Sequence, residues 1–399
     1  ELRCGYISLL ERFKRNFPKA EVGVFLRDYL VPTFKKRAEV DAINDMNFLT
    51  KDDVLFLNGR WLMRYGEIEL EGDEKVGLKD GEIVYIRAKR ETIERNKADS
   101  LPKLLENLKD ALPNEETDAI LLNYPWDLIN NNPEAMRWDF EAFGNSGIYG
   151  KFAEYAVVYG DKDKVFVAET AEVQPFVVLD TTTGPIYIDE GVKIYPHTRI
   201  EGPSYIGRDT MIVGAKIREG VSIGPVCRVG GEVEETIFHG YSNKYHDGFV
   251  GHSYIGEWVN LGALTTNSDL KNDYTSVTVY LNGKPTDTGS MKVGAFIGDH
   301  TKTGIGTLLN TGSWIGIMCN LVPGASVLPK YIPSFCWYLG SRISKGLGLN
   351  QALKTARAAM ERRGVHLTDA MEELIRYTEK LTRAEKLEKV KRDRKKASR

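Results

Sequence analysis

Branched aliphatic residues recur with a period of six through the middle of this chain. Neither the 3.6-residue period of a helix nor the two-residue alternation of an exposed strand produces such a repeat. A six-residue repeat is typical of a parallel β-helix, in which each coil contains three short strands and the inward position recurs every sixth residue. The predicted inward series runs through Ile188, Ile194, Ile200, Ile206 and Ile212, then, after one five-residue step, Ile217, Ile223 and Val229, and later Ile255, Leu261, Ile297, Thr303, Leu309, Ile315, Leu321 and Val327.

Two segments interrupt this period. The first, Glu232–Gly248, is rich in tyrosine and histidine, and the second, Asn267–Met291, is long and polar. Insertions in a solenoid leave from one face and often carry the binding site. We therefore expect function to be concentrated where the six-residue period stops.

The first part of the chain has a different pattern. Short apolar runs at 21–26, 53–57 and 81–87 predict strands, and amphipathic patterns at 6–16, 28–37 and 100–111 predict helices. Strands that alternate with helices favour a mainly parallel sheet covered by helices. The opening strand and Gly-rich turn of a doubly wound nucleotide-binding domain are not visible. We expect an α/β domain over residues 1–165.

The last part of the chain is predicted to be helical. Residues 349–363 and 367–381 both place apolar side chains at helical spacing, with Gly364 between them. Such a pair would cover the end or the side of the solenoid and protect its exposed strand edges. The expected division is therefore 1–165, 166–339 for the β-helix, and 340–399 for the helical segment.

Composition narrows the class of protein. The 399 residues carry a net charge of −2, which argues against a nucleic-acid partner. The basic run at 386–399 is interpreted as a solvated helix end, with a weak contact to a polyanion or membrane surface as the alternative. The four cysteines lack CxxC spacing, and neither a signal peptide nor an 18-residue apolar stretch is visible. These features predict a cytoplasmic protein without a zinc site, a disulfide framework or a membrane partner.

The segment Tyr241–Gly251 offers the best candidate chemistry. It brings Lys244, Tyr245, His246 and Asp247 together where the first repeat series stops. A histidine in a groove between β-helices can act as a general base during acyl transfer from a thioester. A turn-capping role is the alternative for His246, and the histidines at 239, 252 and 300 are interpreted as structural. Because a flat apolar prism face favours closed cyclic packing, we expect a homotrimer with sites between subunits.

Several segments carry a family resemblance. SNKYHDGFVGHSYIGEWVNLGALTTNSDLKN, at 242–272, resembles the acetyltransferase half of the GlmU-like family, whose members acetylate glucosamine 1-phosphate and join the product to UTP. Segments 298–316, 355–368 and 124–132 resemble a GlmU-like sugar nucleotidyltransferase subgroup. The resemblance implies an α/β nucleotidyltransferase-like (Rossmann-like) domain, a left-handed parallel β-helix and C-terminal helices. It further implies a sugar phosphate, a nucleotide and acetyl-CoA as ligands.

The resemblance also assigns roles to residues. His246 matches the family's catalytic base, Asn260 and Asn267 match asparagines that contact the sugar, and Arg218 matches a phosphate-binding arginine. Lys244 and Tyr245, from the same segment as His246, are the other expected substrate contacts. The phosphates of acetyl-CoA need basic partners, and the candidates are Lys302, Lys330 and Arg342.

The chain departs from the family at three places. Phe249 replaces a phosphate-contacting tyrosine, and Glu234 stands where a lysine is usual. Arg60 stands where an aspartate should hold Mg²⁺, and arginine is not a ligand for a cation that needs hard oxygen donors. Asp127 is interpreted as a helix cap rather than as a substitute acid. The resemblance still implies Mg²⁺ as a cofactor of the first domain, but no metal ligand is assigned.

Three functions remain open on sequence. The leading one is acetyl transfer in the β-helix, with or without nucleotidyl transfer in the first domain. The second is nucleotidyl transfer alone, with the β-helix as a trimerisation scaffold. The third is a regulatory protein that binds sugar nucleotides through two degenerate sites, which Arg60 favours.

Overall fold

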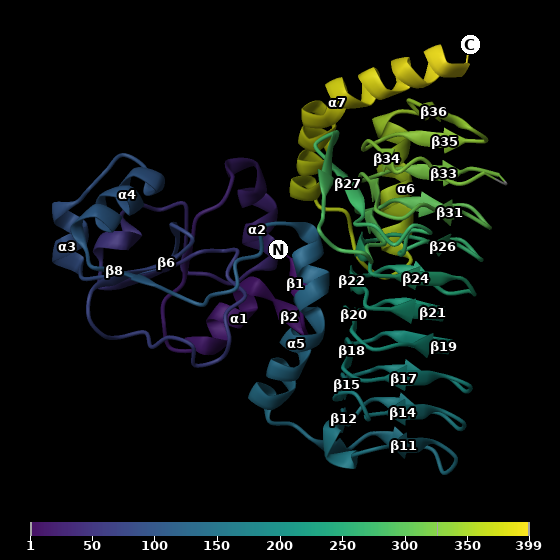
Figure 1. Cartoon of the computed structure of the whole chain (residues 1–399), viewed down its shortest axis with the longest axis horizontal. Coiled ribbons are helices and arrows are strands. Elements are labelled where there is room, and N and C mark those ends of the chain that lie inside the picture. The colour runs from purple at the N-terminus through teal and green to yellow at the C-terminus, as the bar shows by residue number, and fades with distance from the viewer. Residues whose placement is uncertain (1, 325, 398–399) are drawn as a thin grey trace. The chain divides into compact units, whose positions relative to one another are not determined.

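The computed structural model of the chain describes residues 2–324 and 326–397. It separates into two compact units, the first formed by residues 7–124 with Leu2, and the second by residues 3–6 and 125–397. The predicted fold is confirmed: a nucleotidyltransferase-like α/β domain precedes a left-handed parallel β-helix and C-terminal helices (Figure 1).

The first unit contains a four-stranded sheet in the order β5-β7-β6-β8. Its β5–β7 and β6–β7 ladders are antiparallel, so the prediction of a mainly parallel sheet is wrong. The antiparallel β6–β7 ladder follows from the two-residue turn Asp80–Gly81, in which the two residues have positive φ angles of 50° and 79°. An Asp-Gly pair in this conformation is a strong hairpin signal, because its twist matches that of the flanking strands.

The elements of the first unit follow the predicted runs closely. The Ser8 hydroxyl oxygen caps the first helix by accepting from the Glu11 N–H, and the Glu11 carboxylate accepts from the Ser8 N–H. The helices are α1 (Leu9–Asn16), η1 (Asp28–Leu30), α2 (Val31–Arg37), η2 (Phe48–Thr50), α3 (Arg90–Arg95) and α4 (Leu101–Ala111). The strands are β2 (Ile7–Ser8), β3 (Gly23–Val24), β4 (Ala42–Ile43), β5 (Val54–Leu57), β6 (Lys75–Lys79), β7 (Glu82–Ala88) and β8 (Asn114–Glu116).

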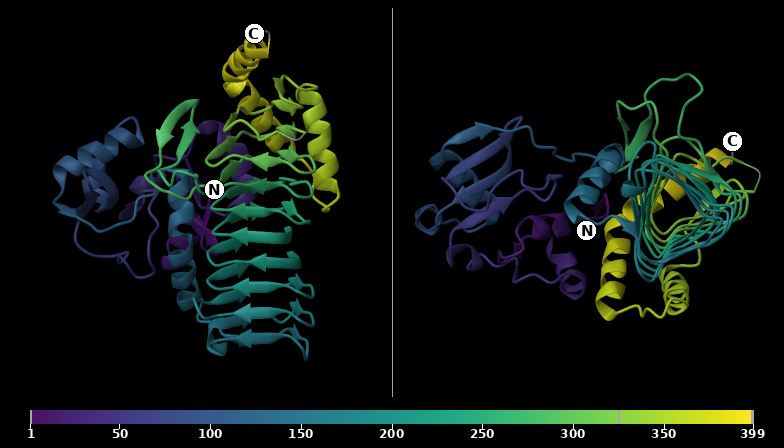
Figure 2. Two further views of the ribbon diagram at one scale, coloured as in Figure 1. Left: turned by 45° about the vertical axis from the view of Figure 1, so that its right-hand side comes forward. Right: turned by 90° about the horizontal axis from the view of Figure 1, so that it is seen from below.

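The β-helix of the second unit has three faces, and the coils superpose in an end view as a roughly triangular outline (Figure 2). Face A holds β10 (Lys151–Phe152), β13 (Glu172–Val173), β16 (Lys193–Ile194), the first parts of β19 (Met211–Ile217) and β21 (Arg228–Glu234), β23 (Asn243–Lys244), β30 (Lys302–Thr303), β33 (Asn320–Val322), β35 (Trp337–Leu339) and β36 (Arg342–Ser344). Face B holds β11 (Val157–Tyr159), β14 (Val178–Asp180), β17 (Arg199–Glu201), the second parts of β19 and β21, β24 (Phe249–Gly251), β26 (Thr266–Asn267) and β31 (Leu308–Leu309). Face C holds β9 (Gly147–Ile148), β12 (Val165–Val167), β15 (Ile186–Ile188), β18 (Ser204–Ile206), β20 (Val221–Ile223), β22 (Ile237–Gly240), β25 (Tyr254–Glu257), β29 (Ala295–Ile297), β32 (Ser313–Ile315) and β34 (Tyr331–Ile332).

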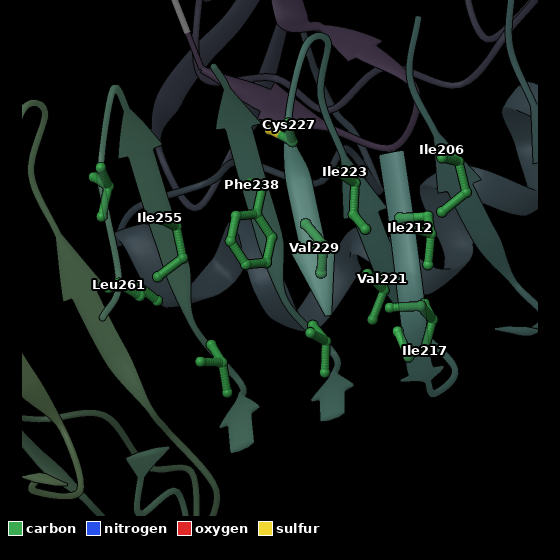
Figure 3. Packing of buried hydrophobic residues seen from close by; sticks show 14 of the residues in the cluster. Ile206, Ile212, Ile217, Val221, Ile223, Cys227, Val229, Phe238, Ile255 and Leu261 are labelled. Carbon is green, nitrogen blue, oxygen red and sulfur yellow. The ribbon is translucent and has the colours of Figure 1, made fainter. Parts of the chain in front are cut away.

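The predicted six-residue series fills the interior of the prism. Ile206, Ile212 and Ile223 are fully buried; Ile206 and Ile223 are neighbours on face C, and Ile212 enters the core from face A (Figure 3). The β-helix already begins at β9, within the range that the sequence assigned to the first domain. The early inward residues Val167, Val173 and Leu179 keep the six-residue spacing, but a nine-residue step to Ile188 hides them from the later series.

The two predicted interruptions behave differently. Glu232–Gly248 is no interruption, because Phe238, Lys244 and Val250 continue the inward positions at spacing six. The pattern was hidden because lysine stands at an inward position. The second is a true insertion, in which β27 (Thr278–Leu281) and β28 (Lys284–Asp287) form an antiparallel hairpin.

The predicted series is wrong at its last member. Val327 is 52% exposed, whereas Leu328 is 1% exposed and belongs to the core. Leu328 follows Leu321 by seven residues, so one residue is added in the turn. A one-residue slip exchanges the inward and outward side chains of a strand.

We expect Leu328→Ala to lower the free energy of unfolding by about 2–5 kcal/mol, because truncation leaves a cavity in the prism. Val327→Ala should change it by less than about 0.5 kcal/mol, as is usual for exposed positions. Denaturant titration followed by far-UV circular dichroism measures both. Equal losses in the two variants would contradict the seven-residue step.

Helices cover parts of the second unit. The helix α5 (Pro125–Phe143) packs on face C, where the rings of Trp126 and Phe296 meet edge to face with centroids 6.5 Å apart. The helix α6 (Leu349–Glu361) runs along the upper coils, and α7 (Asp369–Ala397) lies at the end of the last coil (Figure 2). Val390 of α7 is 2% exposed and joins the core cluster of the β-helix. The remaining elements are β1 (Arg3–Cys4) and η3 (Lys162–Lys164).

Candidate functional site

His246 lies at the A–B corner, the turn that links a strand on face A to the next strand on face B. Here the turn joins β23 to β24. The imidazole is exposed, and the Tyr245 ring stands edge-on to it with centroids 5.2 Å apart. On the coils that follow, the same corner carries Leu264 and Ile305, which are 56% and 78% exposed. His246 is therefore presented to solvent beside an apolar strip.

Lys244 lies inside the β-helix rather than at the substrate surface where the sequence placed it. It is 2% exposed and replaces an aliphatic residue at an inward position of β23. Its Nζ donates to the carbonyl oxygens of Gly230 at 2.7 Å and His246 at 3.1 Å. Burial lowers the pKa of this ammonium to about 8. Lys244 therefore fixes the backbone of the His246 turn from within.

Asn267 is likewise an inward residue, contrary to its predicted contact with sugar. It is 2% exposed, and its amide exchanges hydrogen bonds with the backbone of Gly251, receiving from the N–H at 2.9 Å and donating to the carbonyl at 3.0 Å. Asn260 differs, because it is exposed on face A and accepts from the Asn243 side chain at 3.3 Å. Of the two predicted sugar-contacting asparagines, only Asn260 is available to a ligand.

Arg218 is surrounded by acids and is poorly placed to bind a phosphate. Its guanidinium lies between 3.4 and 4.0 Å from four carboxylates, those of Glu201, Glu219, Glu232 and Glu234. Burial lowers its pKa, but the four glutamates outweigh that effect and raise it. Because this charge is already compensated, the predicted phosphate contact is not supported by the geometry.

The three residues predicted to bind acetyl-CoA lie on separate elements. Lys302, on β30, is covered by α6 and donates to the His300 carbonyl at 2.9 Å. Burial lowers the pKa of Lys302 to about 8, and its side chain lines a cavity beneath α6. Lys330 is half-buried just before β34, and Arg342 is exposed at the start of β36. The structure does not bring them together into one site.

In the first unit, the end of β5 does not suit a divalent cation. The Arg60 guanidinium pairs with the carboxylate of Glu82 and with the Asn123 side chain. Within the described residues, no group of three or more His, Cys, Asp or Glu side chains is placed to hold a metal ion. Asp127, the other acid considered, lies in the first turn of α5, where the helix dipole favours a carboxylate.

Sequence reasoning missed a buried histidine with two acidic partners. His252 is 4% exposed; its Nδ1 lies 2.8 Å from Asp269 and its Nε2 lies 3.1 Å from Glu235. Burial lowers the pKa of the imidazole, but the two carboxylates outweigh that effect and raise it to about 9. Both ring nitrogens therefore carry protons at neutral pH. The partners come from different coils, and no local sequence signal joins them.

The fold and the corner define a hexapeptide-repeat β-helix joined to an α/β domain. Residues 1–146 match the family model for the sugar nucleotidyl transferase domain. The chain is 32% identical over 203 residues to the bifunctional sugar-1-phosphate nucleotidylyltransferase/acetyltransferase of Sulfurisphaera tokodaii, covering 51% of this chain and 44% of that protein. It is 35% identical over 230 residues to the bifunctional protein GlmU of Methanococcus aeolicus, covering 54% and 49%. The predicted relationship to the GlmU-like family is thus confirmed.

The chain spans less than half the length of these two relatives. Among solved structures, the UDP-N-acetylglucosamine acyltransferase of Francisella novicida matches with a TM-score of 0.34 and 14% identity, covering 57% of this chain and 78% of that one. Of the helices that the structure describes, none combines the length and the apolar composition needed to span a bilayer.

Proposed function

We propose that the β-helix transfers an acetyl group to the amine of an amino-sugar phosphate, with His246 as the general base. The observation that carries this proposal is the exposed imidazole at the A–B corner, on a turn fixed from within by the Lys244 ammonium. The relatives named as nucleotidylyltransferase/acetyltransferase support it. A fixed backbone matters because a general base must lie within hydrogen-bond reach of the proton that it removes.

Acetyl-CoA, when bound, supplies the acetyl group as a thioester. His246 removes one proton from the sugar ammonium, so that the amine lone pair can form the C–N bond as the C–S bond breaks. The second proton leaves the nitrogen and passes to the departing thiolate, which gives the amide and the free thiol. Backbone N–H groups of the corner would stabilise the oxyanion that develops on the carbonyl. The apolar strip of Leu264 and Ile305 suits the pantetheine arm, and Lys330 and Arg342 remain the candidates for the phosphates.

We also propose a homotrimer in the cytoplasm, with the sites between subunits. His246 and the apolar strip are exposed in a single chain, so a neighbouring copy would complete a groove around them. The four cysteines are buried and free, which suits a reducing compartment. For the first domain, Arg60 and its partners disfavour nucleotidyl transfer that depends on Mg²⁺ at the end of β5.

The experiment that separates the functions uses the whole chain in two assays. One measures thiol release from acetyl-CoA with glucosamine 1-phosphate, and the other measures pyrophosphate release from UTP and a sugar 1-phosphate with Mg²⁺. We expect turnover in the first assay. Turnover in the second alone would favour the scaffold hypothesis, and saturable binding without turnover in either would favour a regulatory protein.

A further inference from the structure

Three arginines converge on face A around Asn243, which lies one coil before Asn260 and three residues before His246. Arg228 on β21 is the register neighbour of Asn243 on β23, and Asn243 is the bridge partner of Asn260. Arg362 and Arg363 follow the last residue of α6. The Arg363 guanidinium donates to the Asn243 side chain at 2.9 Å, which brings the end of α6 onto this column.

The positive charge of these arginines is not balanced. Among the residues that the structure describes, Arg228 donates only to the carbonyl oxygens of Asp209 and Cys227, both at 2.8 Å. Within the described part of the chain, no carboxylate lies within 4 Å of the guanidinium nitrogens of Arg228, Arg362 or Arg363. The Arg363 Nε is buried without a hydrogen-bond partner. A buried donor of this kind costs free energy unless a ligand or water accepts from it.

The pKa of Arg363 also indicates uncompensated positive charge at this place. Burial lowers the pKa of Arg363, and the charges of Arg228 and Arg362 lower it further. The chain therefore holds like charges together at this place, whereas Arg218 on face B is surrounded by glutamates. An anion would relieve the repulsion, and the planar guanidinium fork matches the oxygens of a phosphate.

We propose that Arg228, Arg362 and Arg363, with Asn243, form a binding site for a phosphate monoester. Asn260, one coil further along the column, would donate to a hydroxyl of the same ligand. Asn243 precedes His246 by three residues, so the site lies about 10 Å along the strand from the proposed base, within reach of a sugar phosphate. The identification of this ligand as the acetyl acceptor rests on the proposed function. The anion site itself does not depend on that function.

Calorimetric titration of the whole chain tests the site, with inorganic phosphate, glucose 1-phosphate and glucose as probes. We expect the wild type to bind the two phosphates and not glucose. Arg363→Gln and Arg228→Gln should each weaken phosphate binding about tenfold or more, because a charge-assisted fork is lost. Arg363→Lys should keep part of the affinity, since it retains the charge without the fork. Lys354→Gln, an exposed change of equal charge on α6, should leave binding unchanged within about twofold.

Coenzyme A and its dephospho form distinguish the other source of a phosphate monoester. If the arginines hold the 3′-phosphate of the coenzyme, Arg363→Gln should weaken only the phosphorylated form and leave glucose 1-phosphate unaffected. Arg363→Gln could instead lower the melting temperature while binding every phosphate as the wild type does. That result would show that the arginines cap the end of α6, and it would contradict the proposed anion site. Acetyl transfer is measured in a separate assay. A failure of the general-base hypothesis for His246 can therefore be distinguished from a failure of the anion-site proposal.

Discussion

Replacing His246 with alanine should lower the kcat for acetyl transfer by about 10²–10⁴-fold, the usual contribution of a positioned general base. The imidazole is exposed and contributes no hydrogen bond to the core, while Lys244 holds the turn through the backbone carbonyl. The variant should therefore keep its melting temperature and its molar mass by light scattering. Loss of activity would then report on chemistry rather than on folding.

His197→Ala is the matched control. This histidine is exposed at the same A–B corner, between β16 and β17, three coils earlier, where it stacks on Phe176. Its removal should leave kcat within about twofold, as expected for a surface residue away from the site. Turnover in His246→Ala within about threefold of the wild type would remove the general-base assignment.

The second large effect concerns the buried histidine at the edge of the insertion. His252→Gln should lower the free energy of unfolding by about 3 kcal/mol, near the low end for removing one partner of a buried ion pair, because Glu235 is partly exposed. The change leaves the carboxylates of Asp269 and Glu235 facing a neutral amide. Since the Asp269 carbonyl also accepts from the Val293 amide, both ends of the insertion are tied to this cluster. Hydrogen exchange across 270–291 should therefore accelerate.

The stabilisation should depend on pH with a definite sign. The folded pKa of His252, about 9, lies above its usual value of about 6.5, so its contribution is complete below pH 6.5 and is lost as pH rises through 9. The hydrogen bond to His252 lowers the pKa of Glu235. Burial raises the pKa of Asp269, but its own hydrogen bond to His252, together with the positive charges of His252 and Lys292, lowers it overall. Their contribution is present above about pH 4.5 and is lost as pH falls through their folded values. The difference between wild type and His252→Gln should thus be largest between about pH 4.5 and 6.5.

Lys292→Gln serves as the control at the same corner. Its ammonium pairs with Glu234 at 3.4 Å, and its side chain is 48% exposed. Exposed pairs contribute about 0–1 kcal/mol, so this variant should unfold close to the wild type. A difference between wild type and His252→Gln that stays constant from pH 5 to 10 would show that folding does not shift the pKa of the imidazole, which contradicts the ion-pair assignment.

The six-residue period predicts the β-helix because an inward position depends only on local spacing. It gives Ile188 through Val229 correctly, but it stops at Lys244, since apolarity is the only signal that the period uses. Leu328 was misplaced by one residue because a turn residue is added before it. In the first unit, the Asp80–Gly81 pair contained the hairpin signal, and the alternation of strands and helices obscured it.

The candidate site was harder to predict. Motif matching selects His246 as the base but does not indicate which side of the prism its neighbours occupy. Lys244 and Asn267 face inward and Asn260 faces outward, a distinction set by register across coils. The contact from Arg363 to Asn243 joins residues 120 positions apart, so only the packing of α6 reveals it.

The two ends of the β-helix differ in how their terminal strand edges are protected. At one end, α7 covers the last coil and adds Val390 to the core, so a further strand has no free edge to join there. At the other end, β9, β10 and β11 are the terminal members of their faces in the described chain. Charged side chains mark that edge, among them the exposed Lys151 and the Lys162–Lys164 turn. Such charges disfavour edge-to-edge pairing of two copies of the chain. End-to-end association of β-helices into fibres is therefore opposed by a covering helix at one end and by electrostatic repulsion at the other.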